Sequence, residues 1–311
     1  MLPDILPGYD AESISLSPDR EGPASATLVR FAERTGTGRA VLYVHGYNDY
    51  FFCAELGPRF AAAGWDFYAL DLRKHGRSLR AHQTPSLVSD FREYYEELAE
   101  SVARIRARDG VRFLLLAGHS TGGTIAPLFA KDCGGVDALF LNSPFLAFAV
   151  PRINEIALRT GIRLLGRWSP DSVVPRPADP RYAWSLHQDY DRGGEWSYNE
   201  DWKRPGDLAL RAGFVRAAAA GHDRIHGGLR LNLPVLVGAS KRGGGHHEGY
   251  DSTWSSTDTV LDPVVTLQRC RRLGPCVERF EVDGGMHDLM LSAPAVRDRV
   301  WERLLGWMAT L

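Results

Sequence analysis

The sequence has little cysteine and no long apolar run. Its 311 residues include four cysteines, Cys53, Cys133, Cys270 and Cys276, without the spacing of metal ligands. We expect buried free thiols rather than disulfides. No stretch is apolar enough to span a bilayer, and the first ten residues lack the basic start and apolar segment of a signal peptide. These absences predict a cytoplasmic protein with no stable membrane insertion.

An excess of charge of either sign is also absent. The chain carries 37 Lys and Arg against 38 Asp and Glu, which excludes a strongly basic surface for nucleic acid. The glycines at 243–245 do not lead from a strand directly into a helix, so no phosphate or dinucleotide fingerprint is present. We therefore expect neither a nucleic acid partner nor a cofactor. The hydrophobic fraction of 44% is ordinary for a globular protein with a large core.

Predicted strands alternate with predicted helices along the chain. Short β-branched or aromatic runs, predicted as strands, occupy residues 26–33, 40–46, 65–72, 112–118, 136–144, 233–240 and 276–285. Helical patterns occupy residues 51–64, 86–108, 121–134, 262–274 and 293–311. Such alternation of apolar strands with helices is typical of a mostly parallel sheet with helices on both faces, so the predicted fold class is α/β.

One long segment interrupts this alternation. Residues 147–230 contain no clear strand and carry four tryptophans and several tyrosines. The segment is too long for a plain loop. We therefore predict a core formed by residues 1–146 and 231–311, with residues 147–230 inserted as a helical cap.

The stretch "LLLAGHSTGGTIAPL", residues 114–128, places a serine between a predicted strand and a predicted helix. In G-x-S-x-G, Gly118 and Gly122 avoid clashes at a tight turn, and the hydroxyl of Ser120 projects above the sheet. The N–H of Thr121 lies at the helix N-terminus, where negative charge is stabilised. Ser120 is thus a candidate nucleophile. The alternative is that it merely caps the helix.

A serine nucleophile needs a base, and the base needs an orienting acid. In the chain order serine, acid, histidine, the base is His287, just beyond the last predicted strand. The acid is predicted between residues 241 and 263, which offer Asp251, Asp258 and Asp262. We favour Asp258, because Asp262 is placed as the N-cap of the next helix.

A second oxyanion donor is expected after the predicted strand at 40–46. The backbone N–H of Tyr47 suits this role, and Gly46 permits a close backbone approach. We expect His45 to brace this loop rather than act as a base. The adjacent His246 and His247 are more typical of a solvated loop than of metal ligands, so no metal is assigned.

Five stretches in order between residues 41 and 291, "YVHGYNDY", "DLRKHGRS", "GHSTGG", "STDTVLD" and "GGMHDLML", resemble the α/β-hydrolase superfamily. The resemblance is closest to the monoacylglycerol lipase and lysophospholipase-like serine hydrolases. It implies a helical cap after the sixth strand of the family fold. By motif position it also implies Ser120 as nucleophile, Asp258 as acid, His287 as base, and Tyr47 and Thr121 as oxyanion donors.

The predicted activity is hydrolysis of a carboxylic ester through an acyl-enzyme, on a small-molecule ester with an apolar acyl group. Thioesterase, peptidase, perhydrolase and acyltransferase activities remain alternatives because the same residues stabilise the same tetrahedral species. A receptor derived from a hydrolase is a further alternative. Lys74 stands where the family more often has glycine, and we expect this to alter only a loop. No motif indicates an oligomeric state.

Overall fold

The protein is built on one nine-stranded sheet. The computed structural model describes residues 1–148, 161, 165–175, 179–190, 194–206, 208–244 and 251–311. The strands are β1 (Leu2–Pro3), β2 (Tyr9–Asp19), β3 (Gly22–Phe31), β4 (Arg39–Val44), β5 (Asp66–Asp71), β6 (Phe113–His119), β7 (Ala138–Asn142), β8 (Val235–Ser240) and β9 (Val277–Val282). Their order in the sheet is β1-β2-β3-β5-β4-β6-β7-β8-β9.

Six strands, from β5 to β9 in sheet order, run parallel, and β1, β2 and β3 add an antiparallel edge. The predicted mostly parallel sheet is therefore confirmed. The strands β1 and β2 were not predicted. In β2 the buried Ile14 and Leu16 alternate with serines, which is the pattern of a strand with one face on the core.

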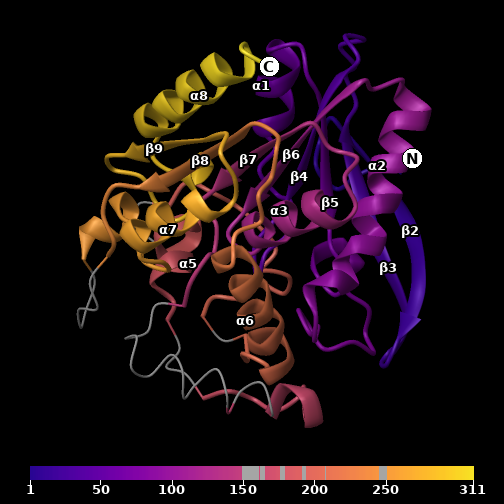
Figure 1. The fold of residues 1–311 in the computed structure, drawn as a ribbon, viewed down its shortest axis with the longest axis vertical. Coiled ribbons are helices and arrows are strands. Elements are labelled where there is room, and N and C mark those ends of the chain that lie inside the picture. Colours follow the sequence, from indigo (N-terminus) through magenta and orange to yellow (C-terminus); the bar gives the residue numbers. More distant parts are fainter. Residues whose placement is uncertain (149–160, 162–164, 176–178, 191–193, 207, 245–250) are drawn as a thin grey trace.

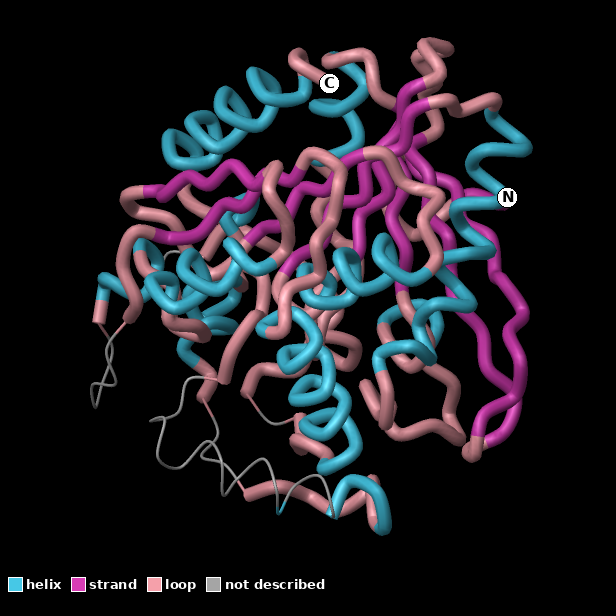
Figure 2. Tube along the Cα trace, viewed as in Figure 1, coloured by secondary structure: helices cyan, strands magenta, loops and turns pink. Residues whose placement is uncertain are grey.

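Helices cover both faces of the sheet, as predicted. They are α1 (Leu56–Ala62), α2 (Tyr95–Asp109), α3 (Gly122–Asp132), α5 (Arg181–Leu186), α6 (Ala212–His226), α7 (Pro263–Arg269) and α8 (Pro294–Met308). Figure 1 shows α1 and α8 on one face and α2, α3 and α7 on the other. Two separate apolar clusters match these layers, one against α1 and α8 and the other against α2, α3, α6 and α7. Figure 2 shows the strands enclosed between the two helical layers.

Two predicted helices are shorter at their starts than the sequence pattern indicated. The helix predicted from residue 51 begins at Leu56. The helix predicted over 86–108 begins as a 3-10 turn at Phe91, because Asp90 and Glu93 form a capping box there, and continues as α2. In both cases the apolar residues before the helix are buried by tertiary packing. Because they are apolar, they extend the helical pattern of the sequence beyond the helix itself.

The segment between β7 and β8 carries α5 and α6 in its described part (Figure 1). Helix α6 packs on α3, so it lies next to the element that follows Ser120. All four cysteines are free, but the expectation that they are buried is wrong for two of them. Cys133, the C-cap of α3, and Cys276, just before the edge strand β9, are exposed.

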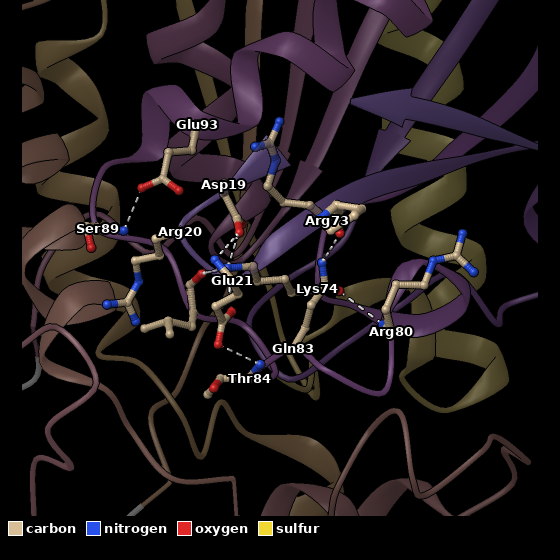
Figure 3. A network of polar contacts seen from close by, with 12 residues as sticks. Asp19, Arg20, Glu21, Arg73, Lys74, Arg80, Gln83, Thr84, Ser89 and Glu93 are labelled. Atoms are coloured by element: carbon tan, nitrogen blue, oxygen red, sulfur yellow. Dashed lines mark hydrogen bonds and ion pairs between the residues drawn. The ribbon is translucent and has the colours of Figure 1, made fainter. Parts of the chain in front are cut away.

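Lys74 does more than alter a loop. Its φ of 64° is a left-handed conformation that suits glycine, yet its side chain is almost completely buried. Its ammonium group lies 2.7 Å from the carboxylates of Asp19 and Glu21, at the turn between β2 and β3 (Figure 3). It also donates to the carbonyl of Leu87 at 3.0 Å. One buried lysine therefore ties the antiparallel edge of the sheet to the loop after β5.

The same turn also touches the segment between β7 and β8, since Arg20 pairs with Asp171. Burial raises the pKa of Asp19, but the hydrogen bond from Lys74 is among the contacts that lower it, and the pKa lies below its ordinary value of 3.8. The pairing therefore stabilises the fold above pH 3.8, and the stabilisation is lost as the pH falls through the lowered pKa.

We expect Lys74→Met to lower the free energy of unfolding by about 3 kcal/mol at pH 7, because it leaves two nearly buried carboxylates without their cation. Urea unfolding followed by circular dichroism measures the change. The exposed Lys131→Met is the matched control and should change stability by no more than about 0.5 kcal/mol. Equal stability of the two variants would contradict this role of Lys74, as would a deficit that does not shrink below pH 3.8.

Candidate active site

The turn between β6 and α3 holds Ser120 in a strained conformation. Its φ is 50°, a left-handed value that a non-glycine residue adopts at a cost of about 1–3 kcal/mol. A Cβ at Gly118 would lie 2.4 Å from the carbonyl oxygen of Gly122. A Cβ at Gly122 would lie 2.3 Å from the carbonyl oxygen of Val44 on β4. Glycine is required at both positions because strand and helix approach this closely.

Ser120 is not the helix cap. The N-cap of α3 is Thr121, in a helical conformation and without a side-chain capping bond. The backbone of Ser120 is instead tied to the end of β7. Its N–H donates to the carbonyl of Asn142 at 3.1 Å, and its carbonyl accepts from the N–H of Phe145 at 2.9 Å. These two bonds hold the turn so that the serine stays between strand and helix.

His287 and Asp258 are in direct contact. His287 Nδ1 lies 3.0 Å from Asp258 Oδ2, and both side chains are buried. The other carboxylate oxygen of Asp258 accepts from the backbone N–H groups of Val260 and Leu261, at 2.9 and 2.8 Å. With Nδ1–H donated to the carboxylate, the lone pair of the imidazole is on Nε2, the atom that a general base uses.

The other two candidate acids cap helices. Asp262 Oδ1 accepts from the N–H groups of Val264 and Val265 at the start of α7, which confirms the predicted N-cap. Asp251 accepts from the N–H of Thr253 at the start of a 3-10 turn. Of the three, Asp258 is the one for which the structure gives a contact with His287.

The loop after β4 lies close to Ser120. His45 is fully buried, and it bonds the carbonyl of Gly46 through Nδ1 at 2.8 Å and accepts from the N–H of Leu72 through Nε2 at 3.1 Å. Both ring nitrogens thus hold backbone groups, as expected of a bracing residue. A Cβ at Gly46 would lie 3.0 Å from the Cβ of Ser120, so the loop backbone comes close to the serine.

Ser120 and His287 line the same cavity, which has a volume of about 150 Å³. The other lining residues are Gly46, Tyr47, Asn48, Asp49, His119, Asp179, Tyr182, Ala183, Lys203, Arg204, Gly206 and Val260. The cavity therefore combines the elbow, the loop after β4 and parts of the segment between β7 and β8. Among the described lining residues the carboxylates are those of Asp49 and Asp179, and Asp49 pairs with Lys203 at 2.6 Å and Asp179 with Arg181 at 2.7 Å.

Sequence reasoning missed a polar layer beneath the site. Asp288 Oδ1 accepts from the amide of Asn142 at 2.6 Å, and Asn142 Oδ1 accepts from the N–H of Leu289 at 3.1 Å. These bonds fix the chain on the C-terminal side of His287. The His119 ring lies beside the His287 ring, with centroids 4.8 Å apart. The adjacency of Asp288 to His287 was the available signal, but its partner Asn142 is distant in sequence.

His119 is uncharged at neutral pH. Burial lowers its pKa, and the neighbouring Asp288 raises the pKa by less, so the pKa lies below the ordinary 6.5. A neutral His119 places no positive charge beside the imidazole of His287.

Within the described ranges, no group of three or more His, Cys, Asp or Glu residues is arranged to hold a metal ion. His246 and His247 lie outside those ranges. No helix in the part of the chain that the structure describes is long and apolar enough to cross a membrane.

The sheet, its covering helices and the serine turn after β6 define the protein as an α/β-hydrolase of the serine hydrolase class. Residues 37–233, more than half of the chain, match the family model described as serine aminopeptidase, S33, and the chain belongs to that family.

Lipases are among the known proteins that this chain resembles. The chain is 25% identical over 265 residues to a (lyso)-N-acylphosphatidylethanolamine lipase of Bos taurus, covering 76% of this chain and 70% of that protein. The structure of this chain is similar to that of a monoglyceride lipase of Saccharomyces cerevisiae, with 16% identity and a TM-score of 0.66. The match covers 94% of this chain and 93% of that one. A monoacylglycerol lipase of Paleococcus ferrophilus matches with 16% identity, a TM-score of 0.62 and coverage of 97% and 99%. The family and these relatives support an ester-cleaving serine hydrolase of lipase type.

We expect Gly122→Ala to lower the free energy of unfolding by about 1–3 kcal/mol, because the new methyl group cannot fit against β4 without moving the turn. Gly306→Ala on the exposed face of α8, where a Cβ meets nothing within 4 Å, is the matched control and should be neutral or stabilising by up to about 1 kcal/mol. Thermal unfolding compares the two. An unchanged midpoint for Gly122→Ala would contradict the tight approach of α3.

Proposed function

We propose that Ser120, Asp258 and His287 form a catalytic triad that hydrolyses a carboxylic ester. The observation that carries the proposal is the 3.0 Å contact between His287 and Asp258, in a protein where His287 and the strained Ser120 line one cavity. A histidine oriented by a buried carboxylate is the base that a serine hydroxyl needs before it can attack.

In the proposed mechanism, His287 Nε2 takes the hydroxyl proton as Ser120 Oγ forms a bond with the ester carbonyl carbon. The N–H groups of Tyr47 and Thr121 stabilise the resulting oxyanion. The intermediate then breaks its bond to the alcohol oxygen, which receives the proton from His287. Water, deprotonated by the same histidine, then attacks the carbonyl carbon of the acyl-enzyme. The second intermediate breaks its bond to Ser120 Oγ, which takes the proton back from His287 as the acid is released. No cofactor or metal takes part.

We propose that residues 147–230 form the cap over this site, and that the substrate is a small-molecule ester of the acylglycerol or lysophospholipid type. The lipase relatives support this class of substrate. The described part of the segment supports the cap, since Asp179, Tyr182 and Lys203 line the cavity together with Ser120.

The family description names an aminopeptidase, so an amide substrate is the second candidate. A peptide's terminal ammonium group needs an unpaired carboxylate as its partner. In the part of the lining that the structure describes, the carboxylates are those of Asp49 and Asp179, and each already pairs with a cation of the protein. This pairing favours an ester over a peptide with a free N-terminus.

We expect hydrolysis of p-nitrophenyl esters, tested from acetyl to palmitoyl, to be abolished in Ser120→Ala, because the variant lacks the attacking oxygen. The preferred chain length reports the size of the acyl group that fits beneath the cap. Aminoacyl p-nitroanilides, measured in parallel, test the peptidase alternative. Ester hydrolysis that survives in Ser120→Ala would contradict the proposal, and so would turnover of the anilides alone.

We expect Asp258→Asn to lower kcat by about 10⁴, because the imidazole is then no longer held in the tautomer with the lone pair on Nε2. Asp262→Asn is the matched control, since Asp262 caps α7 and has no proposed role in catalysis. Steady-state kinetics on the preferred ester compares them. Near-native turnover in Asp258→Asn would show that another group orients His287.

A further inference from the structure

The loop that carries the proposed oxyanion donor is held by the segment between β7 and β8. The Asn48 amide donates to the carbonyl of Arg204 at 2.7 Å and accepts from its N–H at 3.0 Å. The hydroxyl of Tyr50 accepts from the N–H of Asn199 at 2.7 Å. Asn48 has a φ of 51°, so the loop is strained where this reciprocal pair forms. The loop therefore depends on distant contacts for its conformation.

The most deeply buried of these contacts is an ion pair. Lys203 Nζ lies 2.6 Å from Asp49 Oδ1, and both side chains are less than a tenth exposed. The second oxygen of Asp49 accepts from the N–H of Gly46 at 3.4 Å. A chain of contacts thus runs from the ammonium group of Lys203 through Asp49 to the backbone beside Tyr47, whose N–H is the proposed donor.

Aromatic rings surround the ammonium group of Lys203. Its ammonium group lies 5.5 Å from the ring centroid of Phe52, 5.4 Å from that of Tyr182 and 5.8 Å from that of Tyr198. Aromatic faces attract a cation at this distance. Burial raises the pKa of Asp49, but Lys203, followed by His119 and His45, lowers it, and the pKa lies below its ordinary value. Asp49 is therefore an anion at neutral pH.

We propose that Lys203 is a positioning residue for the oxyanion hole, acting through Asp49 to hold the loop of Gly46 and Tyr47 against Ser120. The inference rests on the proposed triad chemistry. The N–H of Tyr47 must be fixed where the oxyanion develops. The segment between β7 and β8, which carries Lys203, is then needed to stabilise the transition state. A residue with this role affects the bound transition state and leaves ground-state binding of the ester unchanged.

The test compares Lys203→Met, Lys203→Arg, Asp49→Asn and the Lys203→Met/Asp49→Asn double variant, with the exposed Lys131→Met as the matched control. Two quantities are measured on each: kcat and KM for the preferred p-nitrophenyl ester, and the inhibition constant of a trifluoromethyl ketone with the same acyl chain. The ketone forms a tetrahedral adduct with the serine and so reports the oxyanion hole. Circular dichroism and thermal unfolding verify that each variant is folded.

We expect Lys203→Met to lower kcat about 10- to 100-fold and to change KM by no more than about twofold. The inhibition constant of the ketone should rise by the same factor by which kcat falls. Lys203→Arg should restore most of the activity because it can still pair with Asp49. The double variant should be no worse than Asp49→Asn alone, since both changes break one chain of contacts. If Lys203→Met does not fold, Asp49→Asn carries the same test through kcat and the ketone.

Three results would overturn the proposal. A rise in KM with kcat unchanged would mean that Lys203 binds the substrate. Effects of Lys203→Met and Asp49→Asn that multiply in the double variant would mean that the two act separately. An unchanged inhibition constant in folded Lys203→Met or Asp49→Asn would mean that the oxyanion hole does not depend on the pair. Absence of ester turnover in the native protein would instead contradict the proposed function, before any of these variants is compared.

Discussion

The structure depends on how closely the start of α3 approaches β4 and β6 at the turn that carries Ser120. Gly118 and Gly122 leave no space for a Cβ, so the helix starts directly against β4 and β6. The serine between them is forced into a left-handed conformation that the surrounding backbone bonds maintain. This arrangement fixes the hydroxyl at the carboxyl edge of the sheet, beside the N-terminus of α3. The positions proposed for base, acid and oxyanion donors all follow from that fixed point.

Polar groups around this point are held by partners rather than left to solvent. His287 contacts Asp258, and Asp49 contacts Lys203. His45 holds one backbone group of the loop after β4 and one directly after β5. Each of these side chains is buried, and a buried charge or imidazole without a partner would be costly. Apart from Gly46, which follows His45 directly, the partners come from elements distant in the chain. The site is thus assembled by tertiary packing, and the segment between β7 and β8 is part of it.

Local signals in the sequence were sufficient for the parallel strands, the glycine turn and the N-cap at Asp262, because each depends on residues close together in the chain. Strand β2 was missed because its alternating pattern lies among serines that also suit a loop. Lys74 was underestimated, since nothing near it in sequence indicates that Asp19 and Glu21 surround its ammonium group. The pairing of Lys203 with Asp49 joins residues 154 positions apart, and no local pattern encodes such a contact.

Every step of the proposed mechanism depends on Ser120 as the nucleophile. The most direct measurement is to treat the native protein with a fluorophosphonate, determine the intact mass, and map the modified peptide by mass spectrometry. If Ser120 is the nucleophile, we expect one adduct per chain, on Ser120, and no adduct in Ser120→Ala. Modification of a different residue, or a folded native protein that forms no adduct, would contradict it.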